Sequence, residues 1–170
     1  VYTPSYRARS APDPADVARA AAVLAAAKRP VIYAGQGVHY AKAWESLREL
    51  AETWNIPVTT SIEGKSAFPE NHPLSLGSGG RANPRQVKRF LADADVILGI
   101  GCSFALTGFG VGMPRGKTII HATLDPMDLN KDVVNAVIAR GNAREATSAK
   151  ELAATSDIVM LCLTKSEVVE

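Results

Sequence analysis

The sequence predicts an α/β fold, in which a doubly wound, mostly parallel sheet of about five or six strands carries helices on both faces. Two observations indicate it. Short apolar runs alternate along the chain with longer segments whose apolar residues recur at helical spacing. The apolar runs are nearly continuous and do not alternate with polar residues, as is typical of parallel strands that are covered on both faces.

Five of these runs predict the strands. Right-handed crossovers place the carboxyl ends of parallel strands on one edge of the sheet, where ligands of Rossmann-like folds bind. We therefore look for a site in the segments that follow each strand. The predicted strands cover residues 31–34, 57–60, 96–100, 118–124 and 158–163.

Three helix starts share one pattern, in which a capping side chain precedes a proline: Asp13-Pro14, Asn83-Pro84 and Asp125-Pro126. Proline is tolerated at the first helical position because its missing N–H has no helical partner there. The pattern predicts helices over 14–28, 84–92 and 126–138, and periodicity adds helices over about 41–54 and 148–155. The first is expected to bury Val17, Ala21, Leu24 and either Ala25 or the alanines next to Lys28. The 41–54 helix is expected to bury Ala43, Leu47, Leu50 and Trp54.

Composition narrows the classes of function. A chain of 170 residues with 46% hydrophobic residues and a net charge of +2 is typical of one globular domain and gives no support for a nucleic-acid partner. No apolar run reaches the roughly 18 residues of a membrane helix, so we expect no membrane partner. Cys102 and Cys162 lie in apolar runs, which favours buried thiols in a reducing, cytoplasmic compartment over a disulfide between them. The three histidines lack metal-ligand spacing, so we predict no metal site. Ser103 does not lie in a nucleophile elbow and no base is identifiable, so we predict no catalytic residue.

The two ends of the chain differ from its middle. Residues 1–11 are polar and aperiodic, like a linker, and the chain begins without methionine, so we expect a piece of a longer protein or one built from pieces. We assign residues 12–145 to one α/β domain. Residues 146–170 are expected to add a helix and an extra strand, either foreign to the domain or truncated.

The first glycine-rich turn, Gly35-Gln36-Gly37, has two readings. It follows a strand, where such turns hold nucleotide phosphates, but Tyr40 stands where a dinucleotide fingerprint needs its third glycine. The alternative is a tight strand-to-helix turn that needs positive φ. A second unusual segment, residues 61–81, is long, aperiodic and glycine-rich, and it follows a strand end, so it is expected at the ligand-binding edge.

Four segments in order, "KRPVIYAGQGV", "LAETWNIPVTTSIEGKSAFPENHPLSLGSGG", "ADADVILGIGCSF" and "KTIIHATLDPMDLNKDV", resemble the central domain of thiamine-diphosphate-dependent enzymes. That group contains acetolactate synthase, pyruvate oxidase, oxalyl-CoA decarboxylase and benzoylformate decarboxylase. The resemblance covers roughly residues 12 to 133. It implies a lyase or transferase whose flanking domains bind thiamine diphosphate and Mg²⁺, with homo-oligomeric subunits, and a central domain without catalysis of its own.

The resemblance also implies a nucleotide site, because this domain binds FAD in some members, ADP in others and nothing in several. The contacts would fall, residue by residue, on Gly35, Gln36, Gly37, Thr60, Ser61, Ile62, Gly77, Ser78, Gly101, Cys102, Ser103, Leu124 and Asp125. Glycine amides would face the phosphates, and Asp125 would accept hydrogen bonds from a ribose or adenine. Residues 101–107 lack the arginines and acids of the flavin-binding members, which favours an unliganded or ADP-type domain over a flavoprotein.

Residues 141–170 depart from this pattern and resemble a strand-bearing stretch of the NADP-binding domain of β-hydroxyacid dehydrogenases. Three hypotheses follow. The chain is an excised central domain of a thiamine-diphosphate-dependent enzyme, or an engineered or recombined α/β domain without activity, or a fragment of an NADP-dependent oxidoreductase. A last strand in register with the sheet fits either of the first two.

Overall fold

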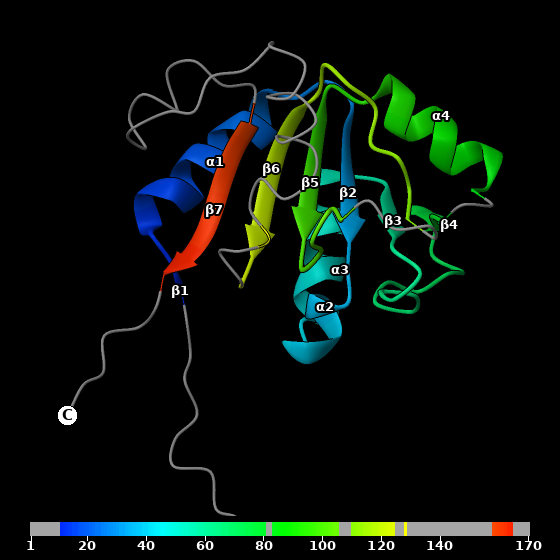
Figure 1. Ribbon diagram of the computed structural model, residues 1–170, viewed down its shortest axis with the longest axis horizontal. Coiled ribbons are helices and arrows are strands. Elements are labelled where there is room, and N and C mark those ends of the chain that lie inside the picture. The colour runs from blue at the N-terminus through cyan, green and yellow to red at the C-terminus, as the bar shows by residue number, and fades with distance from the viewer. Residues whose placement is uncertain (1–10, 81–82, 106–109, 125–127, 129–157, 165–170) are drawn as a thin grey trace, which may run out of the picture.

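The computed structural model describes residues 11–80, 83–105, 110–124, 128 and 158–164 (Figure 1). Within them lie four helices and seven strands. In chain order these are β1 (Ala11–Pro12), α1 (Pro14–Ala26), β2 (Pro30–Ala34), α2 (Gly37–Tyr40), α3 (Trp44–Trp54), β3 (Val58–Thr60), β4 (Ser75–Ser78), α4 (Arg85–Asp93), β5 (Val96–Ile100), β6 (Thr118–Thr123) and β7 (Ile158–Thr164).

All seven strands form one sheet in the order β1-β7-β6-β5-β2-β3-β4. Every pair from β7 to β4 is parallel, and only the two-residue β1 runs antiparallel, against β7. The chain builds outward from β2 to β4, then returns to β5 on the other side of β2 and continues to β7. This reversal between β2 and β5 is the topological switch point of a doubly wound sheet, and it confirms the predicted fold class.

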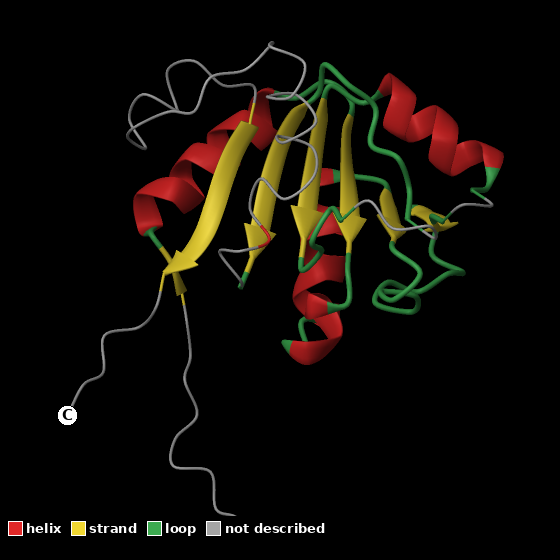
Figure 2. Cartoon of the chain, in the orientation of Figure 1, coloured by secondary structure: helices red, strands yellow, loops and turns green. Residues whose placement is uncertain are grey.

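Helices cover both faces of the sheet (Figure 2). Leu24 of α1 and Leu47 of α3 belong to a core with Ile32, Leu98 and Ile120. On the opposite face, α4 packs in a second core that contains Val31 and Ile97. Neighbouring residues of one strand thus point to opposite cores, as the pleat requires.

The first predicted helix start is confirmed, and the second is wrong in detail. Asp13 caps α1, and its side chain accepts a hydrogen bond of 2.7 Å from the amide of Ala15. For α4, Pro84 is the cap and Asn83 lies outside the helix, where its side-chain oxygen accepts from the amide of Gly80. The predicted helices over 126–138 and 148–155 lie outside the described residues, apart from Asp128.

The predicted inward faces of two helices need correction. In α1, Leu24 is buried, but Val17 is 44% exposed and Ala21 and Ala25 are also exposed, while Ala20 packs in the core. An alanine-rich helix offers two adjacent apolar stripes of similar hydrophobicity, so its sequence pattern does not fix which stripe is buried. In α3, Leu47 is buried as predicted, but Trp54 is 40% exposed and Ala51 takes the buried place.

Three described elements have no counterpart in the prediction: β1, α2 and β4. β4 lies inside the segment 61–81, where Gly77 and two serines hide the strand pattern. Its pairing with β3 is irregular, with a register shift between Val58 and Thr59. β1 begins at Ala11, the last residue of the predicted linker.

Candidate functional site

The candidate site lies at the carboxyl edge of the sheet, where the turns after β2 and β5 meet. The amide of Gly35 donates to the carbonyl of Ile100 at 2.9 Å, and the amide of Gly37 donates to the carbonyl of Gly101 at 2.8 Å. The amide of Gly101 donates in turn to the carbonyl of Ala122 at 2.8 Å. The turns after β2 and β5 and the strand β6 are therefore joined at this edge through their backbones.

The glycines of these turns are needed for close approach. A Cβ atom on Gly35 would lie 2.3 Å from the carbonyl oxygen of Gly101, and one on Gly37 would lie 2.7 Å from the Cα of Gly101. Gly101 has φ +61°, whereas neither Gly35 nor Gly37 has positive φ. The expectation of positive φ in the first turn is wrong, because the constraint there is the contact with the second turn.

Backbone hydrogen bonds at this edge already use the glycine amides that were expected to bind a ligand's phosphate. The amides of Gly35, Gly37 and Gly101 each already donate to a carbonyl. An amide that donates inside the protein cannot also form a full hydrogen bond with a phosphate oxygen. A ligand at this edge would thus need side chains, such as that of the exposed Gln36, or other amides.

The segment after β3 brings the next predicted residues to the same edge. The hydroxyls of Thr60 and Ser78 lie 2.9 Å apart, which ties the ends of β3 and β4 together. The amide of Ser61 donates to the carbonyl of Ala34 at 2.8 Å, and Ile62 is 47% exposed. Gly77 has φ +84° and open space around the position of a Cβ atom.

The remaining predicted residues follow β5 and β6. Cys102 is buried, and burial is the main cause that raises the pKa of its thiol to about 12, which makes it an inert side chain. The hydroxyl of Ser103 accepts a hydrogen bond of 3.2 Å from the amide of Ala105. Leu124 is 65% exposed, and Asp125 lies outside the described residues. Among the predicted site residues that the structure describes, Gln36, Ile62 and Leu124 are the exposed ones.

A row of aromatic rings underlies the site, and sequence reasoning missed it. Tyr33, Gly99 and His121 are aligned across β2, β5 and β6. The ring of Phe104 folds back over Gly99, where a Cβ atom would lie 2.2 Å from its Cζ. It stacks on Tyr33 with centroids 5.7 Å apart and meets His121 edge-on at 4.8 Å. The signal lay in the glycine of "VILGI", which leaves room for a ring, but only strand register identifies the neighbours.

Two members of this row have perturbed ionisation. Burial lowers the pKa of His121, whose Nε2 lies 2.6 Å from the carbonyl oxygen of Cys102; that hydrogen bond and the charge of Asp128 oppose the shift. Burial also raises the pKa of Tyr33, with smaller contributions from Cys102 and Glu63. Both groups are therefore neutral near pH 7. Within the described ranges no three His, Cys, Asp or Glu side chains are grouped to hold a metal ion.

Comparison with known proteins identifies the family of this chain. The family model described as "Thiamine pyrophosphate enzyme, central domain" matches residues 17–152. The chain belongs to this family. Solved structures agree with this family: one described as "a putative thiamin diphosphate-dependent enzyme isolated from Mycobacterium smegmatis" aligns with a TM-score of 0.62 and 30% identity, over 75% of this chain and 25% of its own. Benzoylformate decarboxylase from Polynucleobacter necessarius aligns with the same TM-score and 28% identity, over 78% of this chain and 27% of its own.

The curated relatives of this central domain include acetolactate synthase subunits. A probable acetolactate synthase large subunit from Methanocaldococcus jannaschii is 38% identical over 147 residues, which are 85% of this chain and 25% of the relative. One from Methanococcus aeolicus is 38% identical over 133 residues, 77% of this chain and 22% of the relative. This chain thus spans about a quarter of the length of such relatives. Among the described residues, no helix is long and apolar enough to cross a membrane.

Proposed function

We propose that this chain acts as the central domain of an acetolactate synthase-like lyase or transferase that depends on thiamine diphosphate. In this role it supplies subunit architecture and performs no catalysis alone. The observation that carries the proposal is the family match over residues 17–152 together with 38% identity to an acetolactate synthase subunit. Thiamine diphosphate and Mg²⁺ would bind to flanking domains, which are the proposed partners within a homo-oligomer.

We further propose a nucleotide site at the carboxyl edge, holding ADP in preference to FAD. Support comes from the convergence of the turns after β2, β3 and β5 at the switch point, where ligands of such sheets bind. Gly35 and Gly37 would shape this site, while the exposed side chain of Gln36 would make the polar contact. The lack of arginines and acids in residues 101–107 argues against a flavin.

We also propose an origin for residues 146–170 and a cellular compartment for the protein. β7 pairs with β6 in register, from Ile119 opposite Ile158 to Thr123 opposite Cys162. A native edge strand and a strand acquired by recombination would both give this pairing. An intact parent gene that encodes residues 146–170 together with flanking thiamine-binding domains would contradict a foreign origin. The free, buried thiol of Cys102 supports a reducing, cytoplasmic compartment.

Thermal melting with nucleotides tests the site. The purified chain would be melted with ADP, FAD or NADPH at a free concentration of about 100 times Kd, where one site stabilises the fold by about 2.7 kcal/mol. We expect ADP to raise Tm most. No shift with any of the three would refute the nucleotide site, and a shift with NADPH alone would favour the oxidoreductase fragment.

A pair of variants locates the site. Gln36→Ala removes an exposed side chain for which the structure shows no cap hydrogen bond, so it should leave the Tm of the free chain unchanged and reduce the shift with ADP. Glu49→Ala, on the exposed face of α3, is the control and should keep the full shift. Equal shifts in both variants would place ADP elsewhere.

A further inference from the structure

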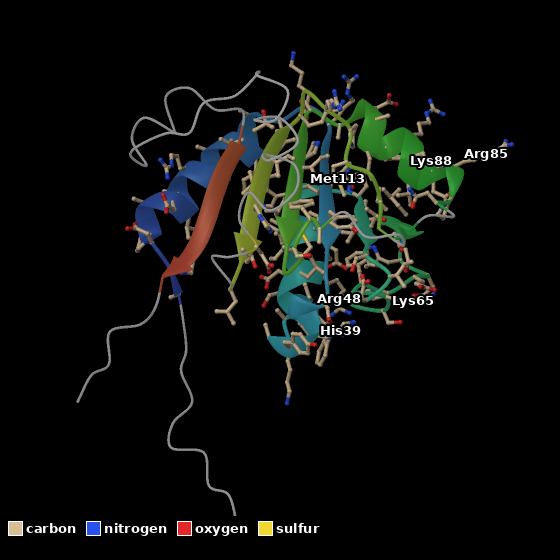
Figure 3. The ribbon with its side chains drawn as sticks, viewed as in Figure 1. His39, Arg48, Lys65, Arg85, Lys88 and Met113 are labelled. Atoms are coloured by element: carbon tan, nitrogen blue, oxygen red, sulfur yellow. The ribbon has the colours of Figure 1, made fainter. Side chains whose placement is uncertain are left out.

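Basic side chains lie together at the amino end of the sheet, opposite the candidate site. They precede β2 and β6, and they line the exposed side of α4. Figure 3 shows Arg85 and Lys88 on α4, far from His39 at the carboxyl edge. We call the following residues the amino-edge patch: Lys28, Arg29, Arg85, Lys88, Arg89 and Lys117.

Hydrogen bonds join the parts of the amino-edge patch into one surface. The carboxylate of Asp95, which leads into β5, accepts from the amides of Lys28 and Arg29 at 2.7 Å and 2.9 Å. The ammonium group of Lys117 donates to the carbonyl of Ala92 in the last turn of α4. The starts of β2 and β6 therefore adjoin the end of α4, and their cations face solvent side by side with those of the helix.

The charges of the amino-edge patch are poorly neutralised. Among the described residues, Arg89 is the one member of the patch in an ion pair, with Asp93 at 3.8 Å, and both side chains are more than half exposed. The carboxylate of Asp95 is engaged by two backbone amides. Cations elsewhere in the described ranges form closer ion pairs: Arg19 with Asp16, Arg48 with Glu45, and Lys65 with Glu70. Unpaired charges of one sign make this surface attractive to an anionic partner.

An exposed aromatic ring adjoins these cations. Phe90 of α4 is 41% exposed, whereas Val87 and Leu91 on the inner side of the helix are buried. Phe90 shares its flank of the helix with Gln86, whose Nε2 donates to the carbonyl of Leu76 on the edge strand β4 at 3.3 Å. The outer side of α4 thus offers both positive charge and one apolar contact.

This combination favours an acidic protein segment over other anionic partners. Single-stranded nucleic acid needs successive aromatic rings on which its bases stack, and α4 exposes one. A helix that lies on a lipid surface inserts a broad apolar face, whereas α4 buries its apolar residues in the core. The guanidinium groups of Arg85 and Arg89 match carboxylates in shape and charge, and an apolar side chain of the same segment would cover Phe90.

We propose that the amino-edge patch is a docking surface for an acidic segment of a partner protein, whose carboxylates pair with the cations of α4 and whose apolar side chain covers Phe90. The patch lies at the opposite end of the strands from the carboxyl edge. Docking there does not depend on the proposed nucleotide site and leaves that site accessible.

Fluorescence anisotropy with labelled glutamate-rich peptides of about eight residues, which extend over about 26 Å, tests the docking. We expect such a peptide with two leucines to bind the chain at about 20 mM salt and to bind more weakly at about 150 mM, where the Debye length is about 8 Å. Arg85→Gln with Lys88→Gln should weaken binding about fivefold, because each exposed ion pair contributes a factor of about two. The control, Arg19→Gln with Lys42→Gln, removes the same charge from other elements and should keep the full affinity. Equal losses in the two variants would overturn the proposal.

Phe90 decides whether the partner is a protein segment. A second peptide of equal charge carries serines in place of the leucines. The leucine peptide should bind about threefold more tightly, as burial of about 25 Å² of apolar surface gives. Phe90→Ser should remove this difference while far-UV circular dichroism shows the chain still folded. Equal affinity of the two peptides for the parent chain would overturn the proposal, and so would tighter binding of a single-stranded thymidine oligonucleotide of the same charge.

Discussion

Gly35 shows how one residue without a side chain allows two loops to meet. The turns after β2 and β5 approach so closely that the Cβ position of Gly35 is occupied by backbone atoms of residues 101 and 102. Backbone cannot move aside as a flexible side chain can. The first turn is therefore built for contact with the second, and this contact brings the predicted site residues together.

Gly35→Ala is accordingly expected to destabilise the chain. The added methyl group would meet the carbonyl oxygen of Gly101 at 2.3 Å, and such overpacking costs about 2 to 3 kcal/mol in the free energy of unfolding. Gly112→Ala is the control, since nothing lies within 4 Å of its Cβ position and its φ is not positive. Urea unfolding should show the control unchanged or stabilised by up to about 1 kcal/mol. Similar losses in both variants would contradict the packing argument.

Asp95 makes a second residue-scale contribution, at the amino end of β5. Its two carboxylate oxygens accept hydrogen bonds from the amides of Lys28 and Arg29, at 2.7 Å and 2.9 Å. Partial burial acts to raise the pKa of this carboxyl, but the hydrogen bonds from these amides outweigh it and the net pKa is lowered. Asp95→Asn keeps the shape but presents an NH₂ group to one amide, which should reduce the free energy of unfolding by about 1 kcal/mol at pH 7.

The pH dependence of this loss follows from the direction of the pKa shift. A carboxyl with a lowered pKa in the folded chain stabilises it above the ordinary value near 4, and this contribution disappears as pH falls through the folded pKa. The difference between parent and Asp95→Asn should therefore shrink towards pH 3 in urea unfolding. Asp93→Asn is the control, because that carboxylate is 60% exposed and lies 3.8 Å from Arg89. An equal loss for Asp93→Asn would contradict this role of Asp95.

The carboxyl edge also shows which site features a sequence can predict. Strand ends and glycine turns predicted the location of Gly35, Ser61 and Gly101, because parallel strands end at one edge. The chemistry of the turns was not predictable, since the acceptors of the Gly35 and Gly37 amides are carbonyls some 65 residues away. Phe104 and its neighbours in the aromatic row were missed for the same reason, because register between distant strands brings them together.

At the scale of elements, the end of α3 illustrates a local rule. Asn55 is its C-cap and adopts the left-handed conformation with φ 51°, and its side chain is exposed. Glycine takes this conformation without a steric penalty, and alanine does not. We expect Asn55→Gly to raise the free energy of unfolding by about 0.5 kcal/mol and Asn55→Ala to lower it by about 1 kcal/mol. Thermal and urea unfolding should rank glycine above asparagine above alanine; any other order would contradict the cap assignment.

Elements differed in how well the sequence predicted them. α1 and the strands β2, β5 and β6 fall where capping residues and apolar runs place them, because those signals are local. β4 was missed because it is a short edge strand with serine and glycine, and its identity comes from pairing with β3. The buried stripe of α1 was assigned wrongly, because only packing against the sheet distinguishes Ala20 from Ala21.

For the whole molecule, one buried histidine makes the free energy of unfolding depend on pH. His121 lies on β6 with 4% exposure, and burial lowers its pKa in the folded chain. As pH falls below about 6.5, His121 takes up a proton in the unfolded chain, whereas in the folded chain it does so only at lower pH. The free energy of unfolding should therefore be fully retained above that pH and fall below it, with a slope of up to about 1.4 kcal/mol per pH unit.

His121→Gln tests this linkage. Glutamine can donate to the carbonyl of Cys102 but loses the edge contact with Phe104, so the variant is expected to be less stable at every pH. The informative quantity is the slope of the free energy of unfolding between pH 7 and pH 5, which should flatten. His72→Gln is the control and should keep the steeper slope, because the side chain of His72 is 18% exposed and that of His121 lies in the buried aromatic row. An unchanged slope for His121→Gln would mean that the acid sensitivity of the fold arises from other groups.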